Sequence, residues 1–151
     1  MTHARQQIRV AIATLVTGLT TTGANVFPSR VHPLQDTDLP GLTVYTTTED
    51  VETDTMMMGT PLAREQHRSL NVVVESYVKA TANFDNILDT IAVEVEKAIL
   101  ADPTLGGLAK DTVLSNTEIS LLSEGDKPVA LATFTFLTQY RVSEIDPETL
   151  L

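Results

Sequence analysis

The chain of 151 residues contains no cysteine. Disulfide bonds, thiol nucleophiles and cysteine-ligated zinc sites are therefore excluded. Basic residues are scarce as well, because ten Lys and Arg stand against 20 Asp and Glu and give a formal net charge of −10. Binding to phosphates requires positive charge, so we expect no specific binding to nucleic acid. An acidic surface still suits a channel through which DNA slides, if several copies enclose one.

Long apolar runs are also missing, since none approaches the roughly 18 residues that span a bilayer. The N-terminal segment combines basic and apolar residues, but Gln6, Arg9 and Thr14 interrupt it. A signal peptide would require a continuous apolar block and a small-residue cleavage site. The sequence therefore predicts a cytoplasmic product with no membrane partner.

The sequence motifs of common reaction centres are absent too. His3, His32 and His67 lie in different segments, without the spacing to a carboxylate or a second histidine that metal ligands show. The Gly-Gly pair at 106–107 lacks the lysine and the preceding strand of a phosphate-binding loop, and there is no Gly-x-Ser-x-Gly elbow. The acidic stretch 49–54 contains no glycine for a calcium-binding turn. We expect no catalytic residue, no cofactor and no metal, and therefore no enzyme.

The clearest pattern in the chain is helical and covers residues 83–100. Apolar residues recur there at steps of three and four, which places them on one face of a helix. The stripe consists of Phe84, Ile87, Leu88, Ile91, Val95, Ala98 and Ile99. We expect the side-chain oxygen of Asn83 to cap the first turn, and Pro103 to prevent further helix. A stripe this wide must be covered, and the flanking segments read as strands that cover it.

Alternating apolar residues, β-branched residues and turn signals predict five strands. These strands cover residues 25–31, 42–48, 66–80, 112–123 and 128–142. The last two are joined by a four-residue polar turn, so they must pair antiparallel. We therefore expect an α+β fold, with a mainly antiparallel sheet and two helices packed on one face.

The remaining segments read as a first helix, loops and a tail. Helical spacing predicts the first helix over residues 2–21, with Gly18 and the following threonines weakening its end. Residues 32–41 and 102–110 are expected to be a loop and a compact turn, and 49–61 a long loop or a mobile hairpin. We expect a single domain over 1–151, with 143–151 forming a loose acidic tail.

The run Met56, Met57 and Met58 is unusual between polar residues. Flexible thioether side chains serve adaptable contact surfaces, and an apolar patch on a loop often marks an interface. Arg64 and Arg68 nearby would supply polar contacts at its rim. These five residues are the candidate assembly interface, unless one or two methionines simply pack under the loop.

Several features resemble one known family when they are taken in order. They are the Val-Phe-Pro-x-Arg segment at 26–30, an Asp-x-Ile-Ala helix core at 89–92, and the turn Asp-Pro-x-Leu-Gly-Gly-Leu at 102–108. A Gly-Asp-Lys-Pro turn and a closing strand that ends in Tyr140 and Arg141 follow. In this order the chain resembles the tail terminator proteins of long, non-contractile phage tails, the minor tail protein U-like family.

The resemblance implies a structural protein of the virion, assembled in the host cytoplasm. Such a protein caps the completed tail tube as a hexameric ring, stops tube polymerisation and provides the surface for head joining. The implied partners are further copies of the chain, the tail tube protein and the head-completion protein. DNA would pass through the ring without specific binding.

Two alternatives remain open at this point. The first is another joining protein of the neck, a head-completion or head–tail adaptor protein, because these families share small folds. The second is a small enzyme or ligand-binding domain, which requires a concave pocket with convergent polar groups. A deep pocket that holds His67 and several carboxylates would favour this second alternative.

Overall fold

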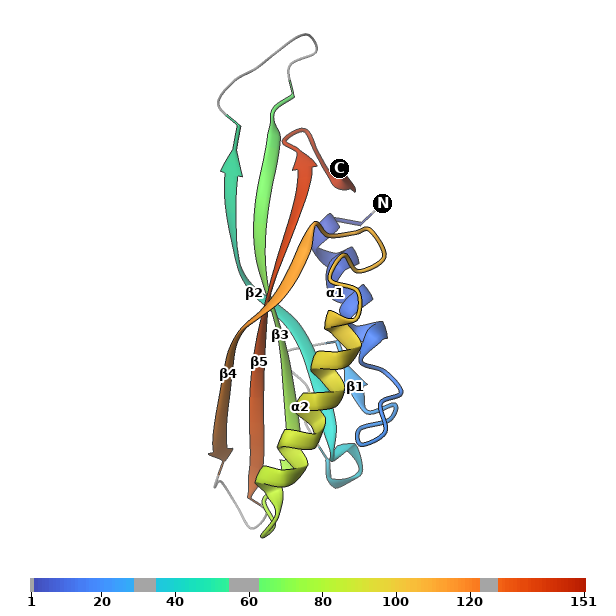
Figure 1. The fold of residues 1–151 in the computed structure, drawn as a ribbon, viewed down its shortest axis with the longest axis vertical. Coiled ribbons are helices and arrows are strands. Elements are labelled where there is room, and N and C mark those ends of the chain that lie inside the picture. The colour runs from blue at the N-terminus through green and yellow to red at the C-terminus, as the bar shows by residue number, and fades with distance from the viewer. Residues whose placement is uncertain (1, 29–34, 55–62, 123–127) are drawn as a thin grey trace.

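The computed structural model describes residues 2–28, 35–54, 63–122 and 128–151 (Figure 1). Within them the chain forms two α-helices, a short 3-10 helix and one six-stranded sheet. In chain order the elements are α1 (Ala4–Leu15), β1 (Val26–Phe27), η1 (Asp36–Asp38), β2 (Gly41–Thr53), β3 (Glu65–Lys79), α2 (Phe84–Leu100), β4 (Asp111–Leu122), β5 (Val129–Ser143) and β6 (Asp146–Leu150).

The sheet has the strand order β1-β2-β3-β5-β4, and β6 pairs with β5. The β1–β2 pair is parallel and all other pairs are antiparallel. Both helices lie on the same face of the sheet (Figure 1). The predicted α+β fold with a mainly antiparallel sheet is therefore confirmed.

The core lies between this face and the two helices. From α2 the predicted stripe contributes Leu88, Ile91, Val95 and Ile99, all of them buried. Alternate residues of the central strands meet them, because successive side chains of a strand point to opposite faces. From β3 and β5 these include Leu70, Val72, Val74, Phe134 and Phe136. Each such side chain stabilises the fold by roughly 1.5–3 kcal/mol through burial.

Both helices depart from the prediction at one end. Helix α1 ends at Leu15 rather than near residue 21, because the chain turns at Gly18, whose φ is +87°. Helix α2 begins after Asn83 as expected, but the Asn83 side chain makes no capping hydrogen bond. No helix in the described part of the chain is long and apolar enough to cross a membrane.

Residues 49–61 were expected to be a long loop or a mobile hairpin. The loop prediction is wrong for the first five residues, which continue β2 and pair antiparallel with β3, as the strands of a hairpin do. A bulge follows Thr46, and pairing with β3 then resumes from Glu49 opposite Leu70 to Thr53 opposite Gln66. The bulge shifts the side-chain alternation, which explains why no regular period is visible in the sequence. Residues 55–62, on which the rest of this prediction falls, lie outside the described residues.

The prediction of a loose tail over 143–151 is also wrong. Residues Asp146–Leu150 form β6, which pairs with the end of β5. The Gln7 side chain of α1 donates to the carbonyl oxygen of Glu148 at 2.8 Å, and the Leu151 N–H donates to the carbonyl oxygen of Arg141 at 3.0 Å. The C-terminal segment is therefore fixed by hydrogen bonds to α1 and β5.

Candidate assembly surfaces

Of the five residues in the predicted interface, Met56, Met57 and Met58 lie outside the described residues. Arg64 lies just before β3, and its guanidinium forms an ion pair with Glu144, with 2.8 Å between Nη2 and Oε2. The Arg64 Nε–H donates to the same carboxylate, whose pKa is thereby held below its usual range. The Arg64 side chain remains 41% exposed, so a partner can still reach it.

Arg68, in contrast, points under the start of α1 into a polar cluster. Its Nη1 lies 2.9 Å from Oε1 of Glu49, and the two side chains are only 12% and 7% exposed. The Glu49 carboxylate also accepts a hydrogen bond from the Tyr140 hydroxyl and lies 3.5 Å from Arg5. His3 Nε2 lies 3.4 Å from Arg68 Nη1. The guanidinium of Arg68 is thus engaged within its own chain.

The electrostatics of this cluster favour its observed hydrogen bonds. Burial, followed by the hydrogen bond to Glu49, raises the pKa of Tyr140, so the phenol remains a donor. Burial and the nearby charges of Arg5 and Arg68 lower the pKa of His3. Its neutral Nδ1 accepts from the Arg5 N–H at 3.1 Å and caps α1. No spacing in the sequence predicted the cluster, because its members come from α1, β2, β3 and β5.

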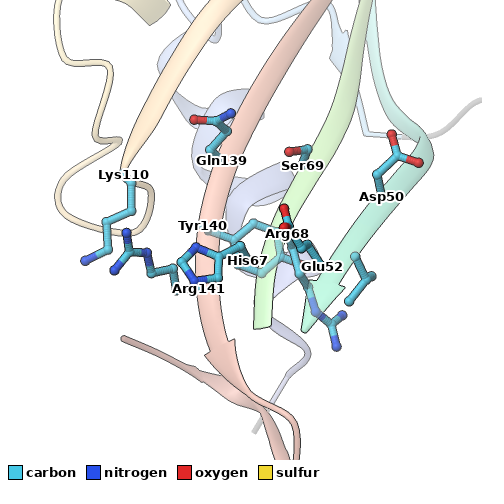
Figure 2. Close-up of a pocket in the computed structure, with 10 residues that line it drawn as sticks. Asp50, Glu52, His67, Arg68, Ser69, Lys110, Gln139, Tyr140 and Arg141 are labelled. Carbon is cyan, nitrogen blue, oxygen red and sulfur yellow. The ribbon is translucent and has the colours of Figure 1, made fainter. Parts of the chain in front are cut away.

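A groove of about 340 Å³ lies across the sheet on the face opposite the helices (Figure 2). Its lining includes Asp50, Glu52, His67, Lys110, Gln139 and Arg141. The acidic side chains come from β2, whereas Lys110 precedes β4 and Arg141 lies on β5; His67 and Arg68 of β3 lie between the two sides. The groove therefore has one acidic rim and one basic rim.

The groove brings His67 together with carboxylates, as an enzyme or ligand-binding domain would require. However, His67 Nε2 lies 3.4 Å from Asp54 and 3.7 Å from Glu65, and the His67 and Asp54 side chains are 40% and 51% exposed. Such solvated pairs interact weakly. His67 is therefore a partly exposed side chain of the groove surface, with only weak pairing to Asp54 and Glu65.

The two long edge strands offer a second kind of surface. Strand β4 pairs with β5 on one side, and four of its large apolar side chains are between 44% and 53% exposed. These are Val113, Ile119, Leu121 and Leu122. At the other edge β1 pairs with only two residues of β2. The segment Glu49 to Thr53 pairs with β3 on its inner side and has no strand partner on its outer side among the described residues. Edges of this kind are templates for pairing with another chain.

No protein-family model and no curated protein matches the chain. Among solved structures it is similar to a chain of a "Virion of native gene transfer agent (GTA) particle", with a TM-score of 0.36 and 16% sequence identity. The alignment covers 91% of this chain and 92% of that chain. A likeness this weak carries no argument about function.

In the described part of the chain, no three His, Asp or Glu side chains are grouped as metal ligands.

Proposed function

We propose that this chain is a structural virion protein that caps a completed phage tail tube as a ring. The observation that carries the proposal is the outer edge of β4, twelve residues long and lined by four exposed apolar side chains. Solvent-exposed edges are normally protected by charges or by a covering element. An unprotected apolar edge is therefore suited to burial against another chain.

A ring requires a contact between two different patches, one on each side of the subunit. The sheet has such patches, because β4 forms one edge of the sheet, and near the other edge β1 pairs with only two residues of β2. The resemblance of the sequence to tail terminators gives this assembly its proposed place, at the head-proximal end of a tail tube. There the ring stops tube growth and contacts the head-completion protein, with Met56, Met57, Met58 and Arg64 as proposed contact residues.

Removing the gene tests this function. Without the protein we expect tails of abnormal length that fail to join heads, and adding the purified chain to such tails should restore joining. Electron microscopy measures both outcomes. Particles with tails of normal length, made without this chain, would overturn the proposal.

The same images separate the proposal from a role elsewhere in the neck. A tail terminator remains on headless tails, whereas a head-completion protein remains on tail-less heads. Antibody labelling of the two purified intermediates locates the chain directly. Finding it on heads alone would favour the neck alternative.

A further inference from the structure

The two rims of the groove carry opposite charges, and three of the charged side chains have no ion-pair partner among the residues that the structure describes. On the acidic rim, Asp50 and Glu52 lie on β2, and on the basic rim Lys110 precedes β4 (Figure 2). None of these three side chains forms an ion pair with another residue that the structure describes. Asp50 and Glu52 lie on the part of β2 that β1 does not pair with, and Lys110 precedes the edge strand β4, so a neighbouring chain could reach both.

The register of the sheet explains why the rims do not meet within one subunit. Asp50, Ser69, Gln139 and Asp111 lie side by side across β2, β3, β5 and β4, and the Lys110 N–H donates to the Gln139 carbonyl oxygen at 2.7 Å. Three strand spacings therefore separate the rims, or roughly 14 Å between backbones. The opposite charges lie at the same level of the sheet but on opposite edges.

The strand directions permit a contact between copies. Three successive antiparallel pairings make β2 and β4 run in opposite directions, as their arrows show in Figure 1. A second copy in the same orientation, placed beside the first, lays its β2 antiparallel to β4. Because the rims lie at the same level, this placement brings the acidic rim of one copy to the basic rim of the next.

We propose that neighbouring subunits meet in this way, with Asp50 and Glu52 of one copy contacting Lys110 of the next. This inference rests on the proposed ring, and it identifies the two surfaces through which neighbouring subunits close the ring. Arg141 adds to the basic rim, because its side chain is 46% exposed although its Nη1 lies 3.2 Å from Glu65. Opposite charges across such an edge fix orientation and register.

Two other groups lie close to this contact. The Asp111 carboxylate is next to Lys110, and its Oδ1 accepts from the Thr112 N–H at 2.9 Å. Val51 lies between the two acidic residues and is 48% exposed. It lies on the side of the sheet that carries the helices, level with Tyr140 of β5, whereas Ile119 of β4 is level with Leu42 near the other end of β2.

Charge reversal tests the contact with two variants, Lys110→Glu and Asp50→Lys/Glu52→Lys. All three positions are exposed, so both variants should fold, which circular dichroism and the thermal midpoint check. In each variant alone, like charges face each other across the contact. We therefore expect ring assembly on tails that lack the protein to fall to about a tenth of the wild-type level or lower. An equimolar mixture should recover wild-type assembly, because alternating copies restore opposite charges at every contact.

The mixture distinguishes a contact between chains from an effect within one chain, which mixing cannot repair. Lys97→Glu, which makes the same charge change on α2, is the matched control and should assemble like the wild type. If the mixture assembles no better than the single variants while the wild type forms rings, this contact is wrong but the ring remains. If the wild type itself forms no ring on these tails, the proposed function fails as well.

Discussion

Glu49 shows how one side chain can anchor a helix to a sheet. Its carboxylate is almost completely buried, and it receives hydrogen bonds from Arg68 and Tyr140 while Arg5 lies 3.5 Å away. Buried charge pairs add little stability relative to apolar packing, but removing one partner leaves the other charge unpaired. The cluster should therefore be sensitive to truncation at this position.

We predict that Glu49→Ala destabilises the protein by about 3 kcal/mol, because it leaves the Arg68 guanidinium uncompensated in a site that is 12% exposed. Urea unfolding measures this change in the free energy of unfolding, provided that the m-value is the same for both proteins. The control is Glu52→Ala on the same strand. Because the Glu52 side chain is exposed, this change should alter the free energy of unfolding by less than about 0.5 kcal/mol. Equal stability of the two variants would show that the cluster does not hold α1 in place.

For single residues, the sequence predicted the burial of apolar side chains better than the contacts of polar ones. The α2 stripe was identifiable because its period is local, and Leu88, Ile91, Val95 and Ile99 are indeed buried. Glu49 and Tyr140 meet only because the sheet brings together positions 91 residues apart. A buried polar cluster assembled from four elements leaves no local pattern in the sequence.

Among the elements, β6 was the least visible in the sequence. Five residues with two acidic side chains and a proline do not alternate as a strand should, so the segment read as a tail. Its position depends on partners elsewhere: pairing with β5, the bond from Gln7, and the ion pair between Arg64 and Glu144. The long strands β3 and β5 were predictable, because their alternation runs over 15 residues each.

We predict that the attachment of β6 weakens in acid. Hydrogen bonds from Arg64 lower the pKa of Glu144 below its usual 4.5, and bonds from Thr149 and Glu148 lower that of Asp146. Carboxyl groups with a lowered pKa in the folded state stabilise it above the usual pKa. This contribution is lost as the pH falls through the folded-state pKa.

Glu144→Gln tests this directly. The variant should have a lower thermal midpoint than the wild type at pH 7, and the difference should disappear below the folded-state pKa of Glu144, where the wild-type carboxyl is also neutral. Glu118→Gln, an exposed position on β4, should match the wild type at both pH values. A difference that persists unchanged in acid would mean that the ion pair does not contribute through its charge.

For the molecule as a whole, assembly has to overcome repulsion. Every copy brings a formal charge of −10, and the charges on neighbouring copies act over about 10 Å at 0.1 M salt. The proposed contact sets Asp50 and Glu52 against Lys110 and against Arg141, which also pairs with Glu65, so it offsets only part of this repulsion. The apolar edge of β4 provides the remaining attraction, and a tail tube would add contacts that free subunits lack.

We therefore predict that the free protein is monomeric at low salt and associates more strongly as salt rises, because screening weakens the repulsion between whole subunits more than it weakens a close contact. Sedimentation velocity at 20 mM and 500 mM NaCl measures the change, and sodium sulfate at equal ionic strength separates screening from strengthened apolar burial. Ile119→Lys and Leu121→Lys should reduce association at high salt, whereas Val93→Lys on α2, equally exposed, should not. A stable hexamer at low salt would contradict this account, because repulsion between free subunits would then be too weak to make assembly wait for the tube.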